Sequence, residues 1–333
     1  QGTTLGADNG IGMALMLAAI TSDTLKHPAL ECLFTVDEET GLTGAFRLQD
    51  GCLNGKQLIN LDSEDDGQVF IGCAGGIDTL AKMHYEAMRL EAKGEKLAIY
   101  IKVGGLMGGH SGDDINKGRG NANKILVRFL YQVMQATDMQ LATINGGNLR
   151  NAIAREAEAV IAIPMAYKED IRVMLNHYIA TIEAEIGNVE QDVFMHLETT
   201  DMPELFIPVD KAKVLIQALY ACPHGMTAMS KTMPGLVETS TNLASVKMKE
   251  DEKGAFVEIN TSQRSSIESK KHDIKQMVEC ALALACDEVT HGDGYPGWAP
   301  NPQSPLLEVT KKAYHDLFAA EPKVLAIHAG LEC

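Results

Sequence analysis

Two adjacent glutamates, Glu38 and Glu39, stand in the stretch TVDEETGLTGA at residues 35–45, where an extended apolar run gives way to a turn. The preceding residues, 31–36, have the pattern of a mostly buried strand. Ligands of α/β proteins usually bind at the carboxyl ends of strands. The pair is therefore a candidate for chemistry, although most acidic residues in a chain with a formal charge of −16 are simply solvated.

Three further segments end on residues that can bind a metal. They are the Gly-rich turn with Asp8 before an apolar helical run at residues 11–20, the strand-like run 58–61 before Asp62, and the strand-like run 324–327 before His328. Clustered carboxylates destabilise one another unless they are protonated or neutralised by cations. Carboxylates with one imidazole suit a divalent metal, above all zinc, and sharing Asp8 between two ions would give a two-metal site. One glutamate of the pair can then bind metal while the other moves a proton.

The stretch GADNGIG at residues 6–12 has a second interpretation, a nucleotide-binding glycine loop that leads into a helix. Asp8 at the helix entrance would repel phosphate, and neither the dinucleotide fingerprint nor the Walker lysine is present. The dipole at the helix N-terminus stabilises a carboxylate there instead. The sequence therefore favours a metal site over a phosphate site.

Eight motifs in this order closely resemble the aminoacyl-histidine (Xaa-His) dipeptidases, the bacterial peptidase D group. This group belongs to the dinuclear zinc peptidase family, which also holds carnosinases and glutamate carboxypeptidase. The resemblance runs over essentially all 333 residues, through GADNGIG, TVDEETGLTGA, NLDSEDDG, GGHSGDDI, NAIARE, QRSS, YPGWAPN and IHAGLEC. It implies an α/β fold with a three-layer αβα zinc-peptidase catalytic domain and an inserted α+β lid domain.

The resemblance also implies the roles of the metal-binding residues. Asp8 would bridge two zinc ions, Asp62 would bind the first ion, and Glu39 and His328 would bind the second. Glu38 would be the general base that takes a proton from the bridging water and passes it to the leaving amine. Co²⁺ or Mn²⁺ would be substitutes for zinc.

Three residues of the predicted lid domain match substrate-contacting positions of the family. By resemblance, His110 polarises the scissile carbonyl or stabilises the oxyanion, Asn151 contacts the substrate, and Arg264 binds its terminal carboxylate. Each also has an ordinary interpretation: a histidine without function, a turn or capping asparagine, and a surface salt-bridge arginine.

The chain departs from the family pattern at both ends. Such enzymes carry a His-x-Asp motif well upstream of the bridging aspartate and continue beyond the motif IHAGLEC, so we expect a chain that is truncated at both ends. Without the upstream histidine, Asp8 and Asp62 alone would form a weak first site, and we expect the chain to bind at most about one zinc ion tightly.

The motifs also predict the domain organisation. We expect a first part of the catalytic domain at residues 1–76, a lid domain for dimerisation and substrate clamping at residues 77–292, and a second catalytic part at residues 293–333. The lid should alternate strands, such as residues 97–105 and 159–165, with helices, such as residues 121–136. The Gly- and Pro-rich segment 292–305 should be a connection. The catalytic strands should form a largely parallel sheet.

Composition narrows the class of protein. A pI near 5.0 argues against nucleic-acid binding, and there is neither a basic stripe nor an apolar run long enough for a membrane. Seven cysteines without a CxxC spacing are typical of reduced thiols in a cytoplasmic protein. We expect a homodimer formed through the lid domain.

The sequence therefore predicts a zinc-dependent dipeptidase that acts on unblocked dipeptides, preferably Xaa-His. Two alternatives remain open. One is an N-acyl amino-acid deacylase or another amidohydrolase on the same scaffold, because metal ligands do not read the substrate side chain. The other is a non-catalytic homologue that has lost the first metal site.

Overall fold

The computed structural model describes residues 9–38, 42–63, 66–90 and 94–331. The chain divides into two compact units. The first unit comprises residues 1–71, 301–325 and 331–333, and the second comprises residues 72–300 and 326–330.

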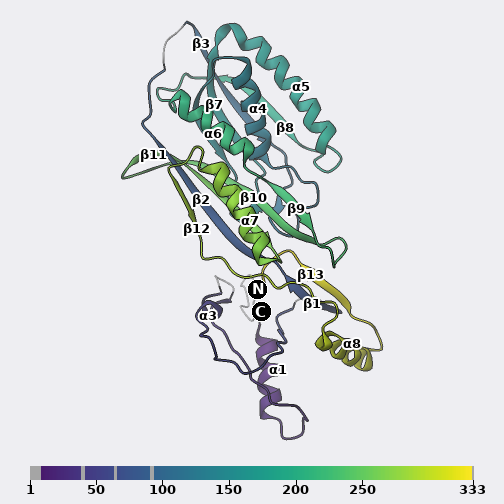
Figure 1. Cartoon of the computed structure of the whole chain (residues 1–333). Coiled ribbons are helices and arrows are strands. Elements are labelled where there is room, and N and C mark those ends of the chain that lie inside the picture. The colour runs from purple at the N-terminus through teal and green to yellow at the C-terminus, as the bar shows by residue number, and fades with distance from the viewer. Residues whose placement is uncertain (1–8, 39–41, 64–65, 91–93, 332–333) are drawn as a thin grey trace, which may run out of the picture. The chain divides into compact units, whose positions relative to one another are not determined.

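The second unit is built on a nine-stranded sheet in which every pairing is antiparallel (Figure 1). The strand order is β12-β2-β11-β10-β5-β7-β3-β8, and β9 pairs with β10 beside this path. The strands are β2 Gly75–Tyr85, β3 Lys96–Gly104, β5 Gln140–Gly146, β7 Ala157–Pro164, β8 Phe194–Thr200, β9 Gly225–Met229, β10 Val237–Asp251, β11 Gly254–Ser265 and β12 Glu288–His291. A separate pair joins β4 Gly109–His110 to β6 Ala152–Ile153.

This sheet contains the same topology twice. The strands and helices of residues 96–200 follow the order β3-α4-β5-β7-α5-β8, which is the βαββαβ pattern of ferredoxin-like folds. The elements β2, α6, β10, β11, α7 and β12 repeat that pattern with the same strand order. The first set, the inserted lobe, enters the second, the host lobe, between its first strand and first helix. Strands β5 and β10 join the lobes edge to edge.

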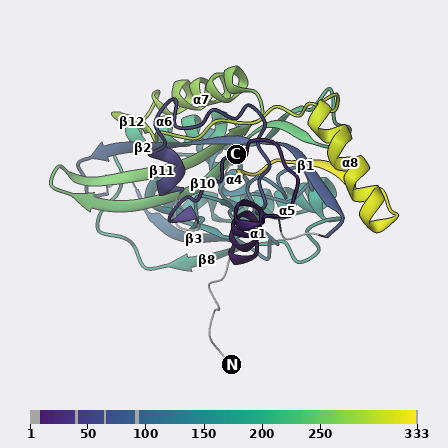
Figure 2. The same cartoon turned by 90° about the horizontal axis from the view of Figure 1, so that it is seen from below.

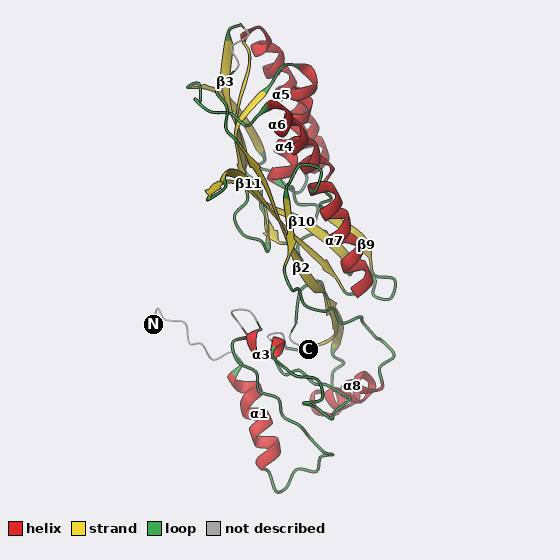
Figure 3. Ribbon diagram, turned by 60° about the vertical axis from the view of Figure 1, so that its left-hand side comes forward, coloured by secondary structure: helices red, strands yellow, loops and turns green. Residues whose placement is uncertain are grey.

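Four helices cover one face of the sheet (Figure 3). They are α4 Ala122–Ala136, α5 Lys168–Ile186, α6 Val209–Ala221 and α7 Glu268–Leu282, and the short 3-10 helix Met165–Tyr167 precedes α5. Alternation along β3 directs Ile99, Ile101 and Val103 into the core beneath these helices. Burying each such side chain contributes about 1.5–3 kcal/mol. The Asn121 side chain caps α4 by accepting the Lys124 amide at 3.2 Å.

Strands β10 and β11 form a long two-stranded ribbon that ends in a tight turn after Asp251 (Figure 2). The ribbon matters for the site because β11 runs from this turn to Arg264, near its other end. The host lobe therefore has one end at Arg264 and an opposite end at the β10–β11 turn.

The first unit contains little paired structure among its described residues. Its helices are α1 Gly10–Thr21, α3 Thr43–Phe46 and α8 Pro305–Phe318, and β1 Gln68–Cys73 pairs with β13 Lys323–Ile327. The helix expected at residues 11–20 and the strand expected at residues 324–327 are both confirmed.

Two expected strands of the first unit are wrong. Residues 31–36 and 58–61 have no strand pairing, and Leu58 and Ile59 are 52% and 68% exposed. An apolar run indicates that a segment favours burial, whereas a strand also needs a neighbouring strand to bond its backbone groups. No described segment supplies that neighbour here.

Candidate active site

A glycine-rich loop of the inserted lobe carries His110 between β3 and α4. We define the His110 loop as residues 105–120. Gly109 has a φ angle of +140°, which strains residues with a side chain, and a Cβ there would collide with the Asp114 carboxylate. The pairing of His110 with Ala152 joins the loop to the connection between β5 and β7.

The surroundings of His110 leave one ring nitrogen available. Nδ1 is 3.2 Å from the Asp113 amide and 3.3 Å from the Gly112 amide, and it accepts from these donors when the ring is neutral. The neutral ring then carries its proton on Nε2, and a protonated ring carries one there as well. Nε2 has no hydrogen-bond partner among the described residues, so it can donate to a ligand. The Asp113 carboxylate lies 3.4 Å from Nδ1, and His110 lowers the pKa of Asp113.

Arg264 is a buried cation near the end of β11. Its side chain is 8% exposed, Nη1 donates to the Tyr295 hydroxyl at 2.9 Å, and Nη2 donates to Ser111 Oγ at 3.4 Å. Among the described residues, Nε has no hydrogen-bond partner and no carboxylate lies within ion-pair distance of this guanidinium. The Asp113 carboxylate interacts with this charge only from beyond ion-pair distance, so part of the cost of burying the guanidinium stays uncompensated. This arginine is therefore suited to an anionic ligand.

His328 follows β13 and is 4% exposed. Its Nε2 lies 2.7 Å from Ser240 Oγ, and Nδ1 makes no well-aligned hydrogen bond to a described residue. Burial, followed by the positive charge of Arg264, lowers the pKa of His328 to about 4. The imidazole is therefore neutral near pH 7, the form in which histidine binds a metal.

The structure brings together the four predicted site residues of the second unit. These are His110, Asn151, Arg264 and His328. The Ser111 amide donates to the Asn151 carbonyl at 2.8 Å, and the Ser111 hydroxyl contacts Arg264. At Gly112 the backbone packs against both the His110 ring and the His328 carbonyl, which leaves no space for a side chain.

The predicted residues of the first unit are placed differently. Asp8 and Glu39 lie outside the described residues. Glu38 lies in a helical turn and its carbonyl accepts the Leu42 amide at 3.1 Å, while Asp62 is exposed and its amide donates to Asn60 Oδ1 at 2.7 Å. Their roles as base and ligand stay predictions.

Sequence reasoning missed several partners of these residues. They are Ser111, Asp113, Ser240 and Tyr295. Three of them stand inside or beside quoted motifs, GGHSGDDI and YPGWAPN, so the motifs contained a signal for them. Ser240 has no such signal, because it meets His328 from 88 positions away.

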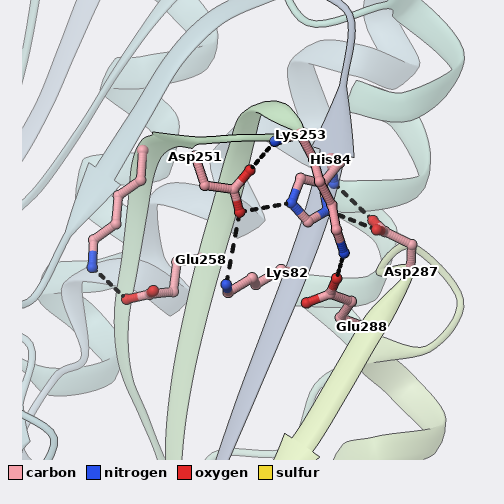
Figure 4. A network of polar contacts seen from close by, with 8 residues as sticks. Lys82, His84, Asp251, Lys253, Glu258, Asp287 and Glu288 are labelled. Atoms are coloured by element: carbon pink, nitrogen blue, oxygen red, sulfur yellow. Dashed lines mark hydrogen bonds and ion pairs between the residues drawn. The ribbon is translucent and has the colours of Figure 1, made fainter.

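A second polar cluster lies at the opposite end of the host lobe (Figure 4). His84 of β2 is 2.7 Å from Asp287 and 3.2 Å from Asp251, and these hydrogen bonds, with Asp251 first, raise its pKa. Lys253 pairs with Glu288, and Lys82 lies 3.9 Å from Asp251. Lys249 pairs with Glu258 nearby. Ligand atoms of His84, Asp287 and Glu288 lie within 4.8 Å of one another, as a metal site would need, yet each side chain already has an ionic partner.

A groove of about 340 Å³ opens where the two lobes join, lined by side chains that include Lys102, Arg155 and Lys247. Neither His110, Arg264 nor His328 lines it. The groove is thus distinct from the candidate site.

Among the described residues, no helix has the length and apolar character to cross a membrane.

Comparisons with known proteins agree on one family. The profile of the peptidase dimerisation domain, M20_dimer, matches residues 101–190. Cytosol non-specific dipeptidase of Escherichia coli (strain K12) is 39% identical over 333 residues, which are 100% of this chain and 67% of that protein.

The solved structure of aminoacylhistidine dipeptidase from Vibrio alginolyticus has a TM-score of 0.92 to this chain at 38% identity. The match spans 100% of this chain and 67% of the Vibrio alginolyticus chain. These matches confirm the predicted α/β peptidase fold with an inserted dimerisation domain and the resemblance that the motifs indicated. The chain therefore belongs to the M20 peptidase family, among the dipeptidases that include these two enzymes.

Proposed function

We propose that the protein hydrolyses dipeptides that end in a free carboxylate. Arg264 is the observation that supports this most strongly, because it is a buried guanidinium without a carboxylate partner among the described residues. A substrate carboxylate would complete its hydrogen bonds, since the N–H groups of a guanidinium match the two oxygens.

The neighbours of Arg264 suit the other end of such a substrate. His110 offers the Nε2 proton to the carbonyl oxygen, which gains negative charge as the peptide bond is attacked. Asn151 would contact the substrate from the connection that pairs with the His110 loop.

The metal expected from the family is a pair of zinc ions, with Co²⁺ or Mn²⁺ as substitutes. His328 fits the role of a ligand, because it is neutral and its Nδ1 makes no well-aligned hydrogen bond to a described residue. With His328, the side chains of Asp8, Glu39 and Asp62 would hold the ions, and Asp8 would bridge them. When bound, the ions supply an activated water and polarise the scissile carbonyl.

Glu38 would complete the reaction as the group that moves the proton. Its carboxylate would take a proton from the attacking water and deliver it to the leaving amine, so that the products are two free amino acids. A glutamate beside a ligating glutamate can do this only if its own oxygens stay free of the metal.

The preferred substrate would be an Xaa-His dipeptide. The printed names of the relatives support dipeptides, one as a non-specific and one as an aminoacylhistidine enzyme. We infer a cytoplasmic location from the same source.

A homodimer through the lid domain is also proposed, and the match to the dimerisation domain supports it. Strand β5 is already paired with β10 within the chain. Among the described strands, β12 and β8 form the ends of the sheet. A second copy that extends the sheet would therefore pair there.

The test replaces Arg264 by alanine in the metal-loaded enzyme. We expect kcat/KM for Xaa-His to fall by an amount equivalent to about 2–5 kcal/mol. The kcat/KM for the same dipeptide with an amidated C-terminus should fall far less, because that substrate offers no carboxylate. Arg150→Ala, which removes an exposed arginine paired with Asp78, is the control and should leave both rates unchanged.

Two outcomes would contradict the proposal. Equal losses for free and amidated dipeptides would mean that Arg264 is structural. A preference for N-acyl amino acids over dipeptides in the same assays would favour the deacylase, and inactivity of the fully metal-loaded protein on both would favour the non-catalytic homologue.

A further inference from the structure

A buried carboxylate holds the two ends of the His110 loop. Glu190 lies between α5 and β8 and is 0% exposed. Its Oε2 accepts the Met107 amide at 2.8 Å, and its Oε1 accepts the Gly120 amide at 2.9 Å. These amides stand at the beginning and the end of the loop.

A fully buried glutamate is unusual unless it has a partner that offsets its lost hydration. The partners of Glu190 are backbone amides, and no cation among the described residues forms an ion pair with it. One neutral acceptor per amide would satisfy the same donors at lower cost. The carboxylate instead joins two amides that are 13 positions apart in the chain through one rigid group.

The loop is braced from inside as well. The His110 amide donates to Asp114 Oδ2 at 2.8 Å, and Arg119 lies 3.0 Å from the same carboxylate. On its other side, the loop packs at Gly112 against His328. Glu190 therefore fixes the ends of a segment whose interior is already rigid, so a shift at either end would move His110 as part of one body.

We propose that Glu190 is a positioning residue for His110, an inference that rests on the proposed function. It acts through the His110 loop and touches neither substrate nor metal. By holding both ends, it keeps the Nε2 proton aimed at the carbonyl oxygen. Displacement of a reacting group by about 1 Å can cost about 100-fold in rate.

The test is Glu190→Gln, which keeps the shape but turns one acceptor into a donor that faces an amide. We expect kcat to fall by about 10- to 100-fold with KM nearly unchanged, because the lost contact serves the transition state. Hydrogen exchange should quicken at the Met107 and Gly120 amides. Tyr178→Phe, which removes a buried hydrogen bond from α5 to the Ile125 carbonyl at 2.8 Å, is the matched control and should keep kcat.

A double-mutant cycle separates positioning from general stability. In a His110→Ala background, Glu190→Gln should cause little further loss, because the group through which it acts is gone. Additive losses, or an unchanged kcat in Glu190→Gln, would overturn the inference. If the Gln variant does not fold, Glu190→Asp replaces it, since a side chain shorter by one methylene cannot reach both amides.

Failure of the proposed function would look different. If His110→Ala itself keeps full kcat, then His110 has no catalytic role and the positioning inference falls with it. Faster exchange at the two amides would in that case still identify Glu190 as the residue that holds the loop.

Discussion

The two ends of the host lobe carry polar clusters of opposite character. Around His84, every charged side chain has a partner: the imidazole stands between two carboxylates, and Lys253 pairs with Glu288 (Figure 4). At the other end, Arg264 Nε and His328 Nδ1 make no well-aligned hydrogen bond to a described residue. One strand, β11, links these ends.

This difference in hydrogen bonding distinguishes a cluster that stabilises the fold from one that is suited to bind a ligand. In the cluster around His84, which we call the saturated cluster, every charged group already has a partner and none is available to a ligand. This cluster ties β2, the β10–β11 turn and β12 together. Unsatisfied buried groups destabilise a protein and persist where a ligand completes them. The cluster that resembles a metal site in composition is therefore the structural one, and the cluster with fewer charges is the candidate active site.

The largest expected effect tests whether the cluster around Arg264 and His328, which we call the open cluster, belongs to a hydrolase. Glu38→Gln in the full-length, metal-loaded enzyme should lower kcat by about 10²- to 10⁴-fold, because the proton-transfer group is lost while zinc content stays near wild type. Glu39→Gln should lose zinc. Steady-state kinetics and metal analysis by mass spectrometry are the measurements. Equal metal loss in both variants would contradict the division between base and ligand.

A second prediction concerns the stability of the open cluster. Arg264→Met should raise the melting temperature, because it replaces a buried cation that has no carboxylate in ion-pair contact by an unbranched apolar side chain; the gain is about 1 kcal/mol, at the low end of such replacements. The same variant should lose dipeptidase activity. Thermal unfolding without substrate measures the effect.

The control for this prediction lies in the saturated cluster. His84→Gln should lower the melting temperature instead, because it breaks a network in which each charge is compensated. A lower melting temperature for Arg264→Met would show that its bonds to Tyr295 and Ser111 outweigh the cost of its buried charge.

The sequence predicted the regular elements of the second unit well. The strand expected at residues 97–105 and the helix expected at residues 121–136 agree with β3 and α4 to within about a residue, since apolar periodicity reports which face is buried. The nested pair of lobes could not be predicted in this way. Periodicity is local, whereas nesting is a matter of which strands pair.

Long-range pairing also explains the errors. Residues 31–36 and 58–61 have apolar patterns but no partner strand, so the pattern alone misled. The motif residues His110 and Arg264 were found by resemblance to a family. Their supports were not, because Tyr295 meets Arg264 across 31 positions and Glu190 reaches the His110 loop across 70 or more.

A smaller effect concerns the pH dependence of the saturated cluster. Hydrogen bonds to Asp251 and Asp287 raise the pKa of His84 above its ordinary value of 6.5, so the folded protein binds this proton more tightly than the unfolded chain. The resulting stability is complete below about pH 6.5 and is lost as pH rises through the folded-state pKa. His84 lowers the pKa of Asp251 below 3.8, so that carboxylate's share is lost only in stronger acid.

The measurement compares wild type and His84→Gln by chemical denaturation between about pH 4.5 and 9. The difference in unfolding free energy should be largest at the acidic end and shrink as pH rises. Lys253→Ala serves as the comparison, because it removes a charge that does not titrate in this range. A difference that grows with pH would mean that His84 is neutral in the folded protein.

The last prediction is that substitution in the saturated cluster leaves the zinc content of the protein unchanged. A cation entering between His84, Asp287 and Glu288 would have to displace the His84 proton and the Lys253 ammonium, and the ligand atoms would lose bonds that they already make. Zinc per chain should therefore be the same in His84→Gln and wild type, whereas His328→Gln should lower it. Because both variants replace a histidine by the same amide, mass spectrometry of the two side by side isolates the environment of the imidazole as the variable. Loss of zinc from His84→Gln would show that partnered side chains can still form a metal site, and the distinction between the two ends of the host lobe would then fail.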